Sequence, residues 1–326
     1  APASMLWGQN TYVPDDNFEQ ALIDLGYDDT LDDYVVTANI SGLTSLAVGD
    51  KDIVDLTGIE AFTSLTSLDC GFNDLTSLDV SSITGLTYLD FASNQLTSID
   101  LSNNTSLEYL YAQNNQLTSM DLGNLSSLHT IMYNYNQLPS MDLSANTGLI
   151  KIECTDNGIT SMDVSNFTAL EELTCYQNEL TSLDLSSNPA LKVLSCFTNQ
   201  LIHLNMKNGV TDALTFYATG NSFDCIEVNA DDIAYATANW TYANDNIDAG
   251  VEFSVVCSPE GYTYVPDNNF EQALIDLGYD DVLNDFVLTE NISGVTTLDV
   301  SVKEISDLTG IEAFTALTEL VCYNNY

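Results

Sequence analysis

The chain has 326 residues, with 48 acidic residues, five lysines and no arginine, and a formal net charge of −43. Such an anionic surface repels nucleic-acid phosphates and anionic lipid head groups, so neither nucleic acid nor a charged membrane surface is an expected partner. No apolar run reaches the length that crosses a bilayer, so no membrane insertion is expected.

Residues 1–11 precede the first recognisable pattern and are interpreted as a remnant of cloning or of a cleaved secretory signal. Residues 12–42 are predicted to form an N-terminal cap, because they hold a short amphipathic helix that ends at Gly26. Asp15 or Asp16 is expected to cap the start of this helix. The apolar face of the helix is predicted to comprise Phe18, Ala21, Leu22 and Leu25.

Residues 43–213 are organised by an internal repeat. Six gapless units of 21 residues run from Leu65 to Ala190, and each follows the pattern LxxLx(C/F/Y/A)xxNxLTSLDLSxN. A related unit with one extra residue begins at Leu43, and a looser one follows from Leu191. This is the leucine-rich-repeat signature, in which a unit buries its apolar residues only by stacking on its neighbours. The expected fold is an α/β-type, mostly β solenoid: a curved right-handed superhelix with a parallel sheet on its concave side.

Asparagine recurs at the ninth position of the repeat. The backbone must turn inside the protein after each strand, and a buried side-chain amide can satisfy the backbone groups that the turn leaves unpaired. A structural role is therefore predicted for this column. It comprises Asn73, Asn94, Asn115, Asn136, Asn157, Asn178 and Asn199.

Aspartate recurs at the fifteenth position, two residues before a serine or glycine. A carboxylate that accepts the backbone N–H two residues on is a common turn device. A row of carboxylates that binds Ca²⁺ is the alternative, because hard cations take several oxygen ligands, and no other cofactor is expected. The column comprises Asp79, Asp100, Asp121, Asp142, Asp163 and Asp184, of which Asp100, Asp121, Asp142 and Asp163 are the candidate metal ligands.

Five of the seven cysteines occupy the sixth repeat position, which Phe91, Ala112 and Tyr133 fill in other units. This position is predicted to face the core, where cysteine behaves as a small apolar group. Sulfurs in one row do not converge tetrahedrally, so no zinc site is predicted. The predicted ladder of thiols comprises Cys70, Cys154, Cys175, Cys196 and Cys322.

Residues 214–261 are predicted to form a C-terminal cap and linker. The two remaining cysteines, Cys225 and Cys257, are expected to close this cap with a disulfide, and Trp240 and Phe253 lie between them. A disulfide indicates an oxidising environment, so the expected location is extracellular, as a secreted protein or on a bacterial cell surface.

Residues 262–326 begin the same pattern again. Tyr264–Asn325 matches Tyr12–Asn73 at an offset of 252 residues, without gaps and at about 70% of positions. The sequence is therefore expected to hold one capped module and the start of a second, truncated module. It also predicts a longer parent protein with tandem solenoids, in which a neighbouring module is one partner.

The LTSLDC and NQLTSLDLSxN segments and the cysteine column, over Leu65–Asn199, resemble the internalin class of bacterial surface proteins. The resemblance is to internalins with 21-residue repeats and cysteine in the strand. It implies a surface adhesin that grips its partner with the concave sheet. The caps depart from that class, and the VPDxNFEQALIDLGYD and DLTGIEAF segments instead resemble leucine-rich modules of large secreted proteins from environmental bacteria.

The outward-facing positions of the concave strands are the predicted ligand-binding surface. Apolar and aromatic side chains at these positions are not explained by the core, and tyrosine offers a large contact area with a polar tip. The alternative is that strands favour tyrosine and phenylalanine for their β-propensity alone. The predicted contact residues are Asp69, Tyr88, Asp90, Tyr109, Tyr111, Met132, Tyr135, Glu153, Glu172, Tyr176 and Phe197.

Binding or adhesion to a protein partner is the predicted function. A polysaccharide-binding module, whose tyrosines stack on sugar rings, and a spacer that binds nothing are the alternatives. No enzyme is predicted, because His129 and His203 fall more than three coils apart and no serine or cysteine has an activating neighbour. Asp69 and Asp90 are the nearest pair of carboxylates to consider for glycoside hydrolysis. They are expected on adjacent strands, closer together than the two carboxylates of a glycoside hydrolase, and on an open face without a pocket.

Overall fold

The computed structural model of the chain describes residues 9–210, 214–258 and 261–326. The chain divides into two compact units, one ending at Val255 and the other beginning at Val256. Residues 1–8 of the predicted N-terminal remnant and residues 211–213 at the predicted end of the repeats lie outside the described residues.

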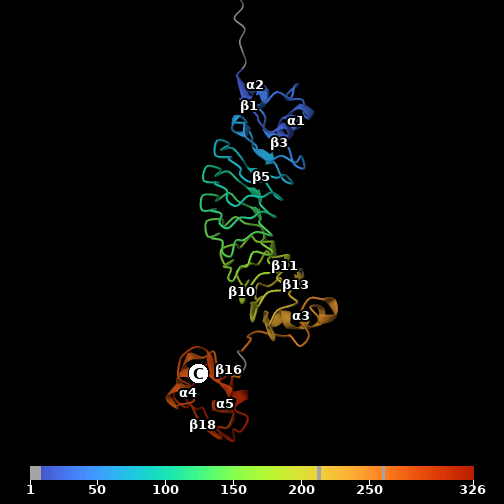
Figure 1. The fold of residues 1–326 in the computed structure, drawn as a ribbon. Helices are drawn as coiled ribbons and strands as arrows, with labels where there is room; N and C mark the ends of the chain where they lie inside the picture. The colour runs from blue at the N-terminus through green and yellow to red at the C-terminus, as the bar shows by residue number, and fades with distance from the viewer. Residues whose placement is uncertain (1–8, 211–213, 259–260) are drawn as a thin grey trace, which may run out of the picture. The chain divides into compact units, whose positions relative to one another are not determined.

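The repeats of the first unit form a solenoid whose main sheet has nine parallel strands (Figure 1). Neighbouring strands pair at the repeat period, so that Ser67 lies opposite Tyr88 and Tyr88 opposite Tyr109. This confirms the predicted leucine-rich-repeat fold with its parallel sheet. In sheet order the strands are β13 (Thr215–Tyr217), β11 (Val193–Ser195), β9 (Glu172–Thr174), β8 (Lys151–Glu153), β7 (Thr130–Met132), β6 (Tyr109–Tyr111), β5 (Tyr88–Asp90), β4 (Ser67–Asp69) and β3 (Ser45–Ala47).

A second parallel sheet was not anticipated from the repeat pattern. From β9 to β14 the chain passes alternately through the two sheets, which therefore form two sides of the same coils. The first two strands of the second sheet come from the LTSLDL and LIHLNM segments. In each of them a central leucine is buried and its two neighbours face outward. In order its strands are β10 (Ser182–Asp184), β12 (His203–Asn205), β14 (Cys225–Glu227) and β15 (Glu252–Ser254).

The N-terminal cap contains β1 (Asn10–Tyr12), α1 (Asp16–Asp24), β2 (Tyr34–Val36) and α2 (Thr37–Ile40), and η1 (Ile59–Ala61) follows β3 in the first repeat unit. Asp15 caps α1 by accepting the N–H of Phe18 at 2.9 Å. Phe18, Ala21 and Leu22 are buried as predicted. Leu25, the fourth residue of the predicted apolar face, is 45% exposed and does not share the burial of the other three. It is the C-cap residue, where the chain has already begun to turn away from the helical face.

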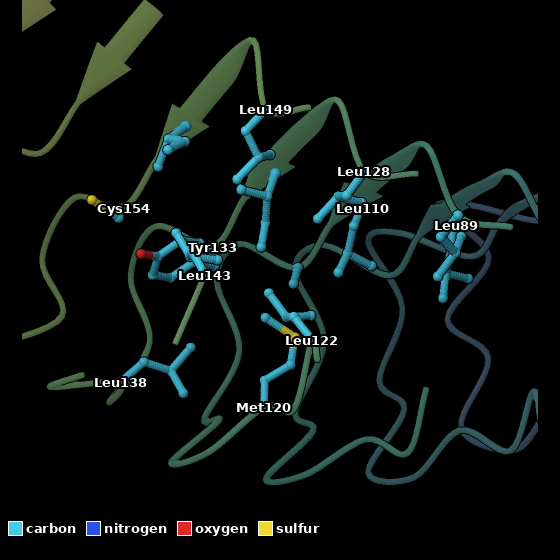
Figure 2. Close-up of a cluster of buried hydrophobic side chains, with 14 of the residues drawn as sticks. Leu89, Leu110, Met120, Leu122, Leu128, Tyr133, Leu138, Leu143, Leu149 and Cys154 are labelled. Carbon is cyan, nitrogen blue, oxygen red and sulfur yellow. The ribbon is translucent and has the colours of Figure 1, made fainter. Parts of the chain in front are cut away.

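One continuous apolar core runs through the first unit, from the N-terminal cap through the coils to the C-terminal cap. Each strand of the nine-stranded sheet places its central side chain in this core. Figure 2 shows successive leucines stacked in rows, with Tyr133 and Cys154 in the same buried layer. Such stacking removes each coil's apolar side chains from water only because a neighbouring coil covers them.

The cysteine column enters the core as predicted. Cys70, Cys154, Cys175 and Cys196 have no exposed surface, and burial raises the pKa of the Cys154 and Cys196 thiols to about 12. Cys322 is the exception, because it follows the last strand of its sheet and is exposed. The prediction of a buried thiol therefore holds for four of these five cysteines.

The asparagine column joins neighbouring coils. Asn94 Nδ2 donates to the carbonyls of Phe91, at 3.0 Å, and of Cys70 in the preceding coil, at 3.1 Å. Its Oδ1 accepts the N–H of Leu75 at 2.9 Å. The same hydrogen bonds recur around Asn115, so the predicted structural role is confirmed.

The C-terminal cap is built on η3 (Ala230–Asp232), α3 (Ile233–Asn239) and η4 (Tyr242–Asn244). The predicted disulfide between Cys225 and Cys257 is present. Trp240 is buried and stacks on Phe216, with ring centroids 4.2 Å apart. This packing joins the cap to β13, the last strand of the nine-stranded sheet.

The second unit repeats the elements of the first cap. It has its own apolar core, in which Phe270 packs on Phe314 as Phe18 packs on Phe62 in the first unit. Its elements are β16 (Tyr262–Tyr264), α4 (Asn268–Asp276), β17 (Phe286–Leu288), α5 (Thr289–Ser293), β18 (Thr297–Asp299), η5 (Ile311–Ala313) and β19 (Glu319–Val321). Because the second unit repeats the order of elements found at the start of the first unit, we propose that it begins another solenoid module.

Candidate functional site

The outward-facing side chains of the nine-stranded sheet, which we call the concave face, form two straight rows. The strands pair in register, so equivalent side chains of successive coils stand roughly 4.8 Å apart. In the first row Asp90 lies opposite Tyr111, Tyr111 opposite Met132, and Met132 opposite Glu153. The second row places Tyr88, Tyr109, Thr130, Lys151 and Glu172 side by side.

An aromatic cluster occupies β5 and β6. The ring centroid of Tyr88 lies 5.3 Å from that of Tyr111 and 6.5 Å from that of Tyr109. Asp90 stands beside Tyr88 and accepts the N–H of Ala92 at 2.9 Å. Partial burial, together with the Asp90 charge, raises the pKa of Tyr88 to about 12, so its hydroxyl keeps its proton at neutral pH. This cluster offers apolar rings and hydrogen-bonding tips in one place.

A charged group lies on β8 and β9, next to β7, the middle strand of the sheet. Lys151 Nζ is 3.0 Å from a carboxylate oxygen of Glu153 and 2.7 Å from one of Glu172. Asn134 Nδ2 donates to the other oxygen of Glu153 at 2.9 Å. Although partial burial lowers the pKa of Lys151, its hydrogen bonds to Glu172 and Glu153 raise it above the usual value. Lys151, Glu153 and Glu172 therefore hold one another in place, and the two carboxylates and one ammonium group together carry a net negative charge.

A second aromatic group follows beyond the strands. Tyr176 and Phe197 stack nearly parallel, with centroids 4.2 Å apart and an interplanar angle of 10°. A hydrogen bond with Tyr176 raises the pKa of Tyr135. Tyr135 is exposed and has a φ of 55°, in the left-handed region that non-glycine residues seldom adopt.

The left-handed conformation of Tyr135 is a property of its repeat position. The eighth residue of seven successive coils has a φ between 52° and 56°. At this point the backbone leaves the strand, and the N–H of Tyr135 donates to the carbonyl of Thr155 in the next coil at 2.8 Å. Stacking therefore fixes these side chains at the edge of the concave face. The seven residues are Phe72, Ser93, Asn114, Tyr135, Asp156, Gln177 and Thr198.

The structure places eight of the eleven predicted contact residues on strands of the concave face, in neighbouring coils, whereas Tyr135, Tyr176 and Phe197 lie in the segments that follow the strands. Tyr217 on β13 is a further exposed aromatic residue that the sequence reasoning missed. Its repeat departs from the 21-residue spacing, because Val193 pairs with Thr215 rather than with a residue 21 positions later. Phe216, the central residue of β13, is buried like the central residues of the other strands. This apolar residue was the feature of the sequence that could have identified the strand.

The aspartate column lies outside this face and belongs to turns. Asp100 Oδ1 accepts the N–H of Ser102 at 2.9 Å, and Asp142 Oδ1 accepts that of Ser144 at 3.0 Å. Hydrogen bonds from the side chain and backbone of Ser102 lower the pKa of Asp100. No cluster of three or more histidine, cysteine, aspartate or glutamate residues able to hold a metal occurs among the described residues. The column confirms the turn interpretation and gives no support to the Ca²⁺ alternative.

Comparison with known proteins places this geometry in context. No family model matches the chain. Internalin J of Listeria monocytogenes serotype 4b (strain F2365) is 38% identical over 72 residues, which are 22% of this chain and 8% of that protein. The structure of the functional domain of InlJ from Listeria monocytogenes, described as including a cysteine ladder, superposes with a TM-score of 0.63 at 26% identity. This superposition covers 98% of this chain and 72% of that one.

The chain is an internalin-like leucine-rich-repeat protein. An internalin (inlF) from Listeria monocytogenes str. 4b F2365 shares the fold, with a TM-score of 0.57 at 19% identity over 99% of this chain and 94% of that one. This internalin-like protein spans only a small part of the length of the curated relative. Among its described residues, no helix is both long and apolar enough to cross a membrane.

Proposed function

We propose that this internalin-like protein is a secreted or cell-surface adhesion module that binds a protein partner through its concave face. The observation that carries the proposal is the in-register row of aromatic and acidic side chains on the nine-stranded sheet. Large aromatic side chains with polar tips dominate the energetics of protein interfaces. Their presence on the outward face, where packing of the core does not require them, supports a binding role.

The charge of the face indicates what kind of partner it fits. Asp69 and Asp90 lie side by side next to the tyrosine cluster, and the Lys151 group carries a net negative charge because it contains two carboxylates. A partner with a basic patch beside apolar residues is complementary to this arrangement. Such binding weakens as salt increases, since screening acts on the exposed charges.

Protein is favoured over polysaccharide by the packing of the rings. Sugars stack on the open face of an aromatic ring, whereas Tyr176 and Phe197 cover one face of each other. The ring of Tyr88 packs at a tilt against those of Tyr109 and Tyr111. These clusters offer edges and hydroxyl groups, which suit the varied contacts of a protein surface.

The test uses the whole chain, labelled and applied to an array of purified surface proteins and to an array of glycans. Binding to an identified protein is then measured by surface plasmon resonance at low and high salt. We expect Tyr109→Ala and Tyr111→Ala each to weaken that binding by roughly tenfold or more, as truncation of a buried interface tyrosine does.

Ile202→Ala is the matched control, because Ile202 is exposed but lies outside the nine-stranded sheet. It should leave the affinity unchanged. Equal binding by the tyrosine variants and the parent protein would refute the concave-face site. Binding to glycans alone, unaffected by salt, would refute the protein partner in favour of a polysaccharide.

A further inference from the structure

Each of the two units buries a pair of carboxylates beside the loop that follows its first helix. In the first unit the pair is Glu19, on α1, and Asp28, in the loop between α1 and β2. Glu19 has no exposed surface. Oε2 of Glu19 and Oδ2 of Asp28 are both buried and have no hydrogen-bond partner in the part of the chain that the structure describes. Such unpaired oxygens are unusual, because removing a carboxylate from water without a partner is costly.

The loop itself encloses the Glu19 side chain. Oε1 of Glu19 accepts the N–H of Asp32 at 3.0 Å and the N–H of Tyr34 at 2.9 Å. The carboxylate therefore lies on the inner side of the loop that begins at Asp28, and its second oxygen is left inside the same enclosed space. Burial raises the pKa of Asp28, and the charge of Glu19 raises it further, so the two carboxylates are near neighbours.

The second unit repeats this arrangement at Glu271 and Asp280. Glu271 has no exposed surface, and its Oε1 accepts the N–H of Asn284 at 2.7 Å. Oε2 of Glu271 and Oδ2 of Asp280 are again buried without a partner among the described residues. The two loops are not identical, since Asn284 stands where the first unit has Asp32. The buried pair of carboxylates is thus present in both units although the loop around it differs.

The donor set of each pair fits a hard cation. Among the residues that the structure describes, no lysine or histidine forms an ion pair with any of these four carboxylates. Divalent calcium and magnesium both take oxygen ligands. Ca²⁺ accepts irregular coordination by carboxylates, backbone carbonyls and water, whereas Mg²⁺ demands near-ideal octahedral geometry. Ca²⁺ is therefore the better match to a pair of carboxylates enclosed by a loop.

We propose that each unit binds one Ca²⁺ ion at its buried pair of carboxylates, Glu19 with Asp28 and Glu271 with Asp280. Ca²⁺ takes about six to eight oxygen ligands, so water and backbone carbonyls complete the shell that two carboxylates begin. The ion links the first helix of the unit to the loop behind it and so stabilises the cap. The expected dissociation constant is on the order of 10⁻⁴–10⁻³ M, as in extracellular calcium-binding modules.

The test counts the calcium ions that the whole chain binds. The protein is stripped with EDTA and titrated with CaCl₂ in about 0.15 M NaCl, which screens diffuse attraction of cations to the anionic surface. Isothermal titration calorimetry measures the affinity and native mass spectrometry the number of ions. We expect two ions per chain, and we expect Ca²⁺ to slow hydrogen exchange in α1 and α4.

Single-atom variants assign the two sites. Glu19→Gln and Glu271→Gln should each remove one of the two ions, and the double variant should remove both. Glutamine keeps an oxygen that can accept the loop N–H groups, and circular dichroism checks that each variant is folded. Asp28→Asn provides a second measurement at the first site. The matched control is Glu179→Gln combined with Glu290→Gln, which makes the same change at one exposed residue of each unit and should leave both ions bound.

The remaining outcomes overturn the proposal. These are no saturable binding up to about ten times the expected dissociation constant, the same number of ions in the double variant as in the parent protein, and equal loss in the control. A parent protein that binds no Ca²⁺ but is stabilised by Glu19→Gln would assign the buried oxygens to a shared proton instead of a metal. Each result is independent of the concave face, whose tyrosines are unchanged in these variants.

Discussion

At the scale of single residues, the asparagine column shows why one side chain recurs where the chain turns inward. A buried turn leaves backbone N–H and carbonyl groups without partners, and an unpaired buried group costs about 1–3 kcal/mol. The amide of Asn115 donates to the carbonyls of Phe91 and Ala112 and accepts the N–H of Leu96. One side chain thus satisfies groups in two coils.

We expect Asn115→Ala to lower the free energy of unfolding by roughly 3 kcal/mol, since it leaves several buried backbone groups unpaired. Urea unfolding followed by circular dichroism measures the change. Asn103→Ala is the control, because Asn103 donates a single exposed hydrogen bond to the Ser81 carbonyl. Its effect should stay within about 0.5 kcal/mol. Equal losses in the two variants would contradict this role for the buried amide.

At the scale of elements, one aspartate attaches each cap helix to its first coil. Asp267 accepts the N–H of Phe270 at the start of α4, at 2.9 Å, and the N–H groups of Ser306 and Asp307, at 2.8 and 3.0 Å. Asp15 makes the equivalent bonds in the first unit, to Phe18, Val54 and Asp55. The helix is therefore both capped and connected through a single carboxylate.

These bonds predict how the second unit responds to acid. Partial burial acts to raise the pKa of Asp267, but hydrogen bonds from Ser306, Phe270 and Asp307 outweigh it and lower the pKa to about 2. An unperturbed aspartate has a pKa of about 3.9. Because the folded pKa is the lower one, the stabilisation is fully present above roughly pH 4 and is lost as the pH falls toward 2.

We therefore expect the protection of the α4 amides in the full chain, measured against the intrinsic exchange rate at each pH, to fall between about pH 4 and pH 2. In Asp267→Asn this additional acid dependence should be weaker, since the amide has no proton to take up. Hydrogen exchange measured by mass spectrometry tests the difference, with α1 and its unchanged Asp15 as the internal control. An identical pH profile for α4 in both proteins would exclude this role for Asp267.

At the scale of the whole molecule, stacking decides which side chains are accessible. Four cysteines of the sixth repeat position are buried because a neighbouring coil covers them, whereas Cys322 is exposed. Burial also raises the pKa of the Cys175 thiol well above its usual value, which suppresses the reactive thiolate. The rate at which the buried thiols react therefore reports whether the coils remain stacked.

We expect iodoacetamide at pH 8 to modify Cys322 in the native protein and to leave Cys70, Cys154, Cys175 and Cys196 unmodified. Peptide mass spectrometry identifies the labelled positions, and the same reaction in urea serves as the control in which all five react. Modification of Cys175 at the rate of Cys322 under native conditions would show that the coils open far more readily than this packing allows.

The 21-residue pattern was enough to predict the features that recur in every coil. A 21-residue period places leucine, cysteine and asparagine at fixed positions of every coil, and each position has one environment because all coils stack alike. The solenoid, the structural asparagines and the turn aspartates were predictable for this reason, whereas the disulfide was predictable because Cys225 and Cys257 are the two cysteines outside the repeat position. The contact residues of the concave face were predictable as outward positions of a strand, and their role in binding stays a prediction.

Other features arise only where particular coils stack on one another, and the repeat pattern did not predict them. The second sheet, the left-handed conformation of Tyr135 and the ring stack of Tyr176 and Phe197 each require a neighbouring coil in register. The stack of Trp240 on Phe216 requires the last coil and the C-terminal cap together. No local pattern encodes these features, because the residues that form them are brought together only when the chain has folded.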